Sequence, residues 1–167
     1  MDNQKKAPTL FFFGAVFFVL FIGLRTMTWL MLDNIQASTI VIPHVLTFSI
    51  TRNLGIAFGI QIGDLAVIIF SILLTIACLI GFCLAAIRKN RWPAWGMMFV
   101  SVGAISNALD RIQHGAVIDY LQYPGIGSNN IADILITIGV SILVIYLLTL
   151  KRHARPSHDS IINPPAR

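Results

Sequence analysis

Apolar residues gather in four long runs along this chain, and polar segments separate the runs. The runs cover about residues 10–32, 65–87, 92–110 and 131–150. A helix needs about 20 apolar residues to cross a hydrocarbon core of about 30 Å, and inside lipid its backbone must satisfy its own hydrogen bonds. The pattern therefore predicts four transmembrane helices in a single domain over residues 1–150. The first run is longer than the apolar segment of a cleaved signal peptide, so we expect a retained anchor.

Two longer segments, residues 33–64 and 111–130, connect the predicted helices on one side of the membrane. Residues 40–50 read IVIPHVLTFSI, which predicts short strands outside the membrane with Pro43 at an edge or a strand end. Residues 111–130 contain Pro124 and three glycines, which favour a loop with little regular structure. The predicted fold class is an all-α membrane protein with a small extramembrane β-sheet on its outer side. Residues 151–167 are expected to form a disordered cytoplasmic tail.

Composition agrees with a membrane protein, and charge gives it an orientation. The chain is 56% hydrophobic and 11% charged, whereas soluble domains are about 25% charged. Nine of its twelve basic residues flank the runs at three places that share one side, which the positive-inside rule assigns to the cytoplasm together with both termini. No basic stripe is interleaved with aromatic residues, so no nucleic-acid partner is predicted.

All seven carboxylates are aspartates, and five of them fall at or beyond the outer ends of the runs: Asp33, Asp64, Asp110, Asp119 and Asp133. Three have an ordinary structural interpretation. Asp64 is best read as a helix cap, Asp110 belongs to a helix end with Asn107 and Arg111, and Asn130 with Asp133 matches an N-cap and its first turn. Asp119 has no such explanation, and an ionisable group beside the membrane is a functional candidate.

Two carboxylates near the bilayer could perform acid–base chemistry. If Asp119 and Asp133 approach each other, they cannot both ionise easily, so the pair holds one proton near neutral pH. One carboxylate can then take a proton from water while the other protonates a carbonyl or a leaving amine. The four histidines lie in unrelated segments without metal-ligand spacing, and no G-x-S-x-G motif occurs. No metal or cofactor is therefore predicted.

Four short motifs in this order resemble the bacterial lipoprotein signal peptidases (signal peptidase II). Residues 53–59 (NLGIAFG) resemble N-x-G-x-A-F, residues 102–112 (VGAISNALDRI) resemble G-G-A-x-G-N-x-x-D-R, residues 115–120 (GAVIDY) resemble G-x-V-x-D-F, and residues 130–133 (NIAD) resemble F-N-x-A-D. The resemblance implies an aspartic endopeptidase of the bacterial inner membrane. It would remove signal peptides from diacylglyceryl-modified prolipoproteins by cutting before the lipid-modified Cys.

The resemblance also implies roles for single residues. It assigns catalysis to Asp119 and Asp133. Substrate binding or support goes to Asn53, Asn107, Arg111 and Asn130, and structural roles go to Asp110 and Gly55. The implied partners are lipidated prolipoproteins, membrane lipid and the peptide antibiotic globomycin, and we expect a monomer.

One part of the family pattern is absent. The family usually has D-x-x-[ST]-K in the outer half of the first span, whereas residues 23–27 read GLRTM and lack both Asp and Lys. The alternative hypothesis is therefore a paralogue that binds lipidated peptides without cutting them or with altered specificity. A four-span channel or carrier ranks last, because the second and fourth runs have no polar residues at mid-membrane.

Overall fold

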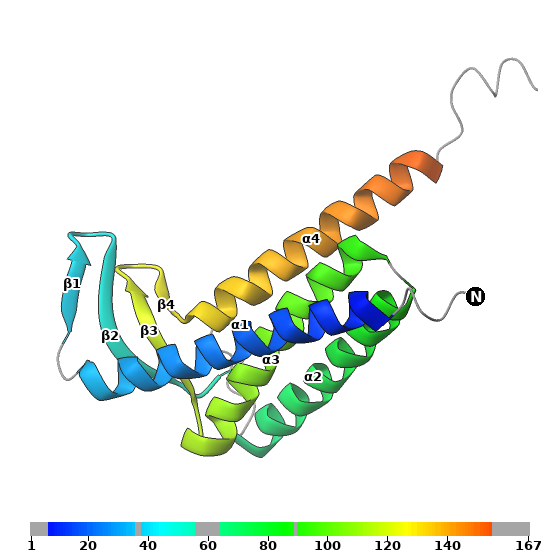
Figure 1. Cartoon of the computed structure of the whole chain (residues 1–167). Helices are drawn as coiled ribbons and strands as arrows, with labels where there is room; N and C mark the ends of the chain where they lie inside the picture. Colours follow the sequence, from blue (N-terminus) through cyan, green and yellow to red (C-terminus); the bar gives the residue numbers. More distant parts are fainter. Residues whose placement is uncertain (1–6, 36–37, 56–63, 89, 155–167) are drawn as a thin grey trace, which may run out of the picture.

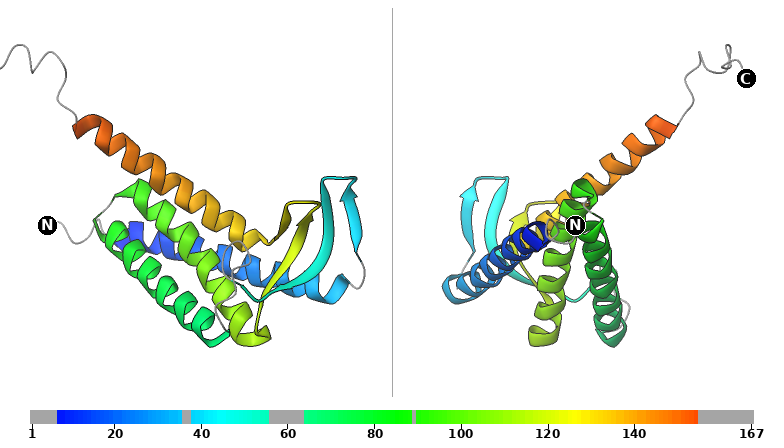
Figure 2. Two further views of the ribbon diagram at one scale, coloured as in Figure 1. Left: turned by 180° about the vertical axis from the view of Figure 1, so that it is seen from behind. Right: turned by 45° about the vertical axis from the view of Figure 1, so that its right-hand side comes forward.

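The computed structural model describes residues 7–35, 38–55, 64–88 and 90–154 (Figure 1). Within these residues it contains α1 (Ala7–Asn34), β1 (Thr39–Ile42), β2 (Leu46–Asn53), α2 (Asp64–Ile87), α3 (Arg91–His114), β3 (Val117–Tyr123), β4 (Gly127–Asn129) and α4 (Ile131–Ala154). The helices pack side by side, and the sheet lies at one end of them, beside the end of α1 and the start of α4 (Figures 1 and 2). Helix α4 continues past the predicted end at residue 150, and residues 155–167 of the predicted tail lie outside the described part.

Among the described residues, three helices are long and apolar enough to cross a membrane: Phe11–Asn34, Leu65–Ile87 and Ile131–Leu150. The third predicted span coincides with α3, which is not one of them, so a fourth span stays a prediction. Helix α3 packs against α1, α2 and α4, and Ala94, Met98 and Val102 on it have no exposed surface. A helix that neighbouring helices cover can carry more small and polar residues than one that faces lipid.

Glycines bring α3 and α4 into close backbone contact. A Cβ atom at Gly103 would lie 2.5 Å from the Ala132 carbonyl oxygen, and one at Gly139 would lie 2.6 Å from the Gly96 carbonyl oxygen. Real Cβ atoms essentially never approach other atoms so closely, so the two helices can pack in this way only with glycine at these positions. This contact places the last turns of α3 beside the first turn of α4.

The sheet has four antiparallel strands in the order β1-β2-β3-β4. The strands predicted within residues 40–50 are confirmed as β1 and β2, and Pro43 lies in the turn between them. The prediction of an irregular loop over residues 111–130 is wrong, because this segment contains β3 and β4. Its glycines act at the ends of elements: Gly115 (φ 71°) ends α3, while Gly125 and Gly127 also adopt positive φ near the β3–β4 turn.

Strand β3 is the buried strand of the sheet, because its first five residues have almost no exposed surface. Val117, Ile118 and Tyr120 are each at most 2% exposed, and Asp119 lies among them with no exposed surface. Pairing with β2 fixes the register, with Asp119 opposite Thr51 and Val117 opposite Asn53. The buried strand therefore carries a candidate carboxylate into the region where the sheet meets the helices.

Candidate active site

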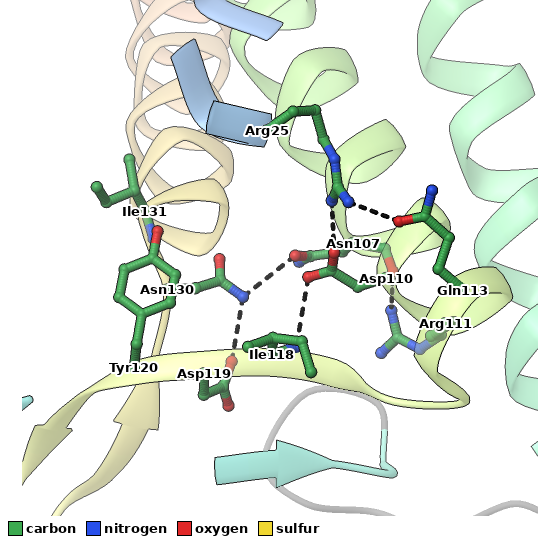
Figure 3. Close-up of polar contacts among 10 residues, drawn as sticks. All are labelled: Arg25, Asn107, Asp110, Arg111, Gln113, Ile118, Asp119, Tyr120, Asn130 and Ile131. Atoms are coloured by element: carbon green, nitrogen blue, oxygen red, sulfur yellow. Dashed lines mark hydrogen bonds and ion pairs between the residues drawn. The ribbon is translucent and has the colours of Figure 1, made fainter. Parts of the chain in front are cut away.

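Asp119 is a fully buried carboxylate whose two oxygen atoms both accept hydrogen bonds. Asn53 Nδ2 on β2 donates to Oδ2 at 3.2 Å, and Ser128 Oγ on β4 donates to the same oxygen at 3.3 Å. Asn130 Nδ2 donates to Oδ1 at 3.1 Å (Figure 3). Donors from two neighbouring strands and from the start of α4 thus hold the side chain from both sides.

Asp133 lies in the first turn of α4 and is bound by residues of α3 and α4. Its Oδ1 accepts a hydrogen bond from Asn107 Nδ2 at 2.7 Å, and its Oδ2 accepts one from the backbone N–H of Asn130 at 3.4 Å. The Asn130 side-chain oxygen accepts the backbone N–H of Asp133 at 3.0 Å in return. This reciprocal pair is a capping box, so the capping interpretation of these two residues is confirmed.

Two asparagines connect the two aspartates. Asn130 Nδ2 donates both to Asp119 and to Asn107 Oδ1, the latter at 3.2 Å (Figure 3). Asn107 in turn donates to Asp133. The hydrogen bonds therefore run from Asp119 through Asn130 and Asn107 to Asp133, and the sequence-predicted residues of three separate motifs lie in one network.

The buried environment changes the proton affinity of Asp119. Burial raises the pKa of its carboxyl group to about 6, and the negative charge of Asp133 raises the pKa as well. The hydrogen bonds from Asn53, Ser128 and Asn130 act in the opposite direction, because they favour the charged form. A carboxyl group with this pKa can hold or release a proton close to neutral pH, which general acid–base catalysis requires.

Arg111 and Gly55 link the end of α3 to the segment after β2. Arg111 Nη2 donates to the Gly55 carbonyl oxygen at 2.9 Å, and Nη1 donates to the Asn107 carbonyl oxygen at 3.4 Å. The Gly55 N–H donates to Asn53 Oδ1 at 3.0 Å. Arg111 Nε is buried and has no hydrogen-bond partner among the described residues. Residues 56–59 of the first motif lie outside the described part of the chain.

Asp110 has the structural environment that its position predicts. It is 2% exposed, its Oδ2 accepts the backbone N–H of Ile118 at 3.3 Å, and its Oδ1 forms an ion pair with Arg25. Among the other candidate aspartates, Asp64 is the first residue of α2, and its role as a helix cap stays a prediction. Asp33 is exposed near the end of α1, away from this network.

Two residues of the site were absent from the sequence-based candidates. Ser128 contacts Asp119 only because the β3–β4 hairpin folds back, and no short motif indicates that contact. Arg25 had a detectable signal, since a charged residue inside an otherwise apolar helix is a functional candidate. A shallow cavity of about 410 Å³ opens beside the site and is lined by Thr51 and by the β3–β4 hairpin from Gln122 to Ser128.

Comparisons with known proteins show which family this chain is similar to. A model of the family described as signal peptidase (SPase) II matches residues 15–149. A lipoprotein signal peptidase from Chlorobium phaeobacteroides (strain BS1) is 37% identical over 125 residues, which cover 66% of this chain and 77% of that protein. One from Bifidobacterium longum subsp. infantis is 33% identical over 132 residues, covering 74% of this chain and 70% of that protein.

Two solved structures of bacterial membrane enzymes resemble this fold. A structure described as a bacterial membrane enzyme, determined by the in meso method at 2.3 Å resolution, superposes with a TM-score of 0.72 at 27% sequence identity. The match covers 87% of this chain and 93% of that one. A second bacterial membrane enzyme, at 1.9 Å resolution, gives a TM-score of 0.68 at 28% identity.

Proposed function

Because this chain belongs to the signal peptidase II family, we propose that it is an intramembrane aspartyl endopeptidase that uses Asp119 and Asp133 as its catalytic pair. Its substrates are diacylglyceryl-modified prolipoproteins, and it cleaves the peptide bond before the lipid-modified Cys. The observation that carries the proposal is the continuous hydrogen-bond network from Asp119 through Asn130 and Asn107 to Asp133.

The pair acts as a unit that holds one proton. The ionised carboxylate takes a proton from water as the water oxygen attacks the scissile carbonyl carbon. The protonated carboxyl gives its proton to the carbonyl oxygen. As the tetrahedral intermediate collapses and the C–N bond breaks, the carboxyl that took the proton from water gives it to the leaving amine. The other carboxylate takes a hydroxyl proton from the intermediate, so the pair again holds one proton. Because the two carboxyls titrate together, the shared proton belongs to the pair and not to one residue.

The surrounding polar groups support this chemistry in two ways. Asn53 and Asn130 orient Asp119, while Asn107 orients Asp133, so both carboxyls are held before substrate arrives. Arg111 adds a cation beside the pair, which favours the ionised form of the carboxylates. Gly55 and Asp110 serve the framework of the site.

The membrane location matches the lipidated substrate. With both termini and the residue 88–91 turn in the cytoplasm, the sheet and the aspartates lie at the outer face of the inner membrane. The diacylglyceryl tail in the bilayer then presents the scissile bond at the depth of the aspartate pair. We propose that the enzyme works as a monomer and that globomycin competes for this site.

A second candidate function is that of a paralogue that binds lipidated peptides without cutting them. The observation that favours it is the absence of the family's Asp and Lys from residues 23–27. Such a paralogue would bind the same lipidated peptides, so binding alone does not distinguish the two functions.

A cleavage assay separates them. The purified protein in lipid or detergent is incubated with a diacylglyceryl-prolipoprotein, and the products are identified by mass spectrometry. We expect a product that begins with the lipid-modified Cys and a released signal peptide. If the substrate binds the protein but stays intact, the enzyme hypothesis is contradicted and the non-cleaving paralogue is supported.

A further inference from the structure

Arg25 is a charged residue in the middle of the apolar helix α1. Its Nη1 forms an ion pair with Asp110 Oδ1, and its Nη2 donates to Gln113 Oε1 at 2.7 Å (Figure 3). Among the side chains that the structure describes, this ion pair is the single one. An arginine whose two terminal nitrogens reach two residues of α3 fixes the orientation of the carboxylate that it contacts.

The second oxygen of that carboxylate holds the catalytic strand. Asp110 Oδ2 accepts the backbone N–H of Ile118, the residue before Asp119. Asp110 is 2% exposed and Ile118 is 1% exposed, so this hydrogen bond lies where water does not compete with it. Arg25 is thus connected to the backbone of β3 through a single carboxylate.

Helix α1 also supports the residue on the other side of Asp119. The Tyr120 hydroxyl accepts the backbone N–H of Ile131 at 3.2 Å and forms a hydrogen bond with Thr28, which is buried on α1. Arg25 and Thr28 are three residues apart and share one face of the helix. Asp119 therefore lies between the Ile118 backbone amide and the Tyr120 side chain, both of which are hydrogen-bonded to other elements, and α1 contributes a side chain to each connection.

Resting on the proposed function, we propose that Arg25 is a positioning residue for the hydrolysis: it fixes the Asp110 carboxylate, which holds the Ile118 amide and thereby sets the position of Asp119. Arg25 touches neither of the two catalytic carboxyls in the described contacts. Its effect is therefore transmitted through Asp110. The cation also offsets the Asp110 charge, which acts electrostatically on Asp133 at the start of α4.

Removing Arg25 would leave a buried carboxylate without its cation. A buried charge that loses its partner is strongly unfavourable, so the Asp110 carboxylate would turn towards water, and this change weakens its hydrogen bond to Ile118. The other charged or titratable groups around Asp110 are Arg111 on α3, Asp119 and Tyr120 on β3, and Asp133 on α4. Arg111 already interacts with Gly55 and Asn107, so it does not replace Arg25.

The kinetic test compares Arg25→Gln and Arg25→Lys with the wild type. We expect Arg25→Gln to lower kcat between about tenfold and a hundredfold with little change in KM, because a small displacement of a catalytic group affects the chemical step. Arg25→Lys keeps the charge and should retain more activity than Arg25→Gln. The matched control is Arg91→Gln, an exposed arginine at the opposite end of α3, which should cleave as the wild type does.

The pH profile gives a readout that loss of structure alone would not move. In Arg25→Gln the uncompensated charge of Asp110 favours the singly protonated form of the Asp119–Asp133 pair. The basic limb of the kcat/KM profile should therefore move to higher pH. The double variant Arg25→Gln/Asp110→Asn removes both charges, and its midpoint should return towards that of the wild type.

Amide hydrogen exchange tests the connection from Arg25 through Asp110 to the Ile118 amide independently of activity. In the wild type the Ile118 amide should exchange slowly, and in Arg25→Gln and Arg25→Lys it should exchange faster. Unchanged exchange in both variants, or an Arg25→Gln variant with wild-type kcat, would overturn the inference and leave the proposed function intact. If the wild type itself cleaves no lipidated substrate, the proposed function fails, while the exchange experiment still decides whether Arg25 holds the strand.

Discussion

Asp119 combines two opposing influences within one side chain. It has no exposed surface, which disfavours its charged form, yet three side-chain donors point at its oxygens and favour that form. The result is a carboxyl group with a pKa raised to about 6 by burial and by the charge of Asp133. Sequence alone could single out Asp119, because it lacks a helix-capping explanation, but the donor Ser128 depends on the folding of the hairpin.

The first prediction at this scale concerns pH. Below about pH 6 the aspartate pair retains its proton, and above that value both carboxyls become ionised. We therefore expect kcat/KM, which reports the free enzyme, to fall as the pH rises through about 6 and also to fall in strong acid once both carboxyls are protonated. A rate that keeps rising between pH 6 and 9 would contradict the shared proton.

Ser128→Ala tests the balance of influences on Asp119. The substitution removes a hydrogen bond that lowers the pKa of this carboxyl, so the basic limb of the kcat/KM profile should move to higher pH. Ser71→Ala is the matched control, because Ser71 bonds only a carbonyl oxygen within α2. A shift to lower pH, or equal profiles for the two variants, would contradict the role given to Ser128.

At the scale of elements, the site depends on how closely α3 and α4 approach. The glycine contacts between these helices allow Asn107 Nδ2 on α3 to lie 2.7 Å from Asp133 Oδ1 on α4. The apolar runs predicted the helices well, because membrane helices need long apolar sequences. They did not predict β3 and β4, since β3 forms by pairing with β2, a partner far away in the sequence, and β4 in turn pairs with β3. Short glycine-rich segments carry no signal of such pairing.

Gly103→Ala tests the helix contact. The added methyl group would meet the Ala132 backbone at 2.5 Å, so α4 must move away and the bond between Asn107 and Asp133 must lengthen. We expect cleavage to fall about tenfold or more, together with a lower melting temperature. Gly14→Ala is the control, because nothing lies within 4 Å of its new Cβ atom. Equal activity of the two variants would show that the close approach is unnecessary.

At the scale of the whole molecule, charge and exposure describe a protein that lies across a membrane. Large apolar side chains such as Phe18, Leu73 and Ile145 are exposed on the three apolar helices, where lipid would cover them. Most basic residues flank the apolar runs near the two chain ends and between α2 and α3. The aspartate pair lies instead where the sheet meets the helices. The family could be inferred from the sequence because four short motifs occur in the family's order, although each motif alone is weak.

The orientation can be measured by cysteine labelling. In a background without Cys78 and Cys83, we expect Ile126→Cys, at the 87% exposed tip of the β3–β4 turn, to react with a membrane-impermeant thiol reagent added outside cells. Arg88→Cys, at the end of α2, should react only after the membrane is opened. The reverse pattern would place the sheet and the candidate site in the cytoplasm and contradict the proposed topology.

The most direct test of the central claim is the cleavage of a diacylglyceryl-prolipoprotein by Asp119→Asn, Asp133→Asn and the control Asp33→Asn. The control removes an exposed carboxylate at the C-terminal end of α1, outside the hydrogen-bond network of the site. With equal membrane insertion and melting behaviour verified, both site variants should lose processing by a factor of about a thousand or more, and the control should process normally. Full processing by either Asp119→Asn or Asp133→Asn would contradict catalysis by the aspartate pair.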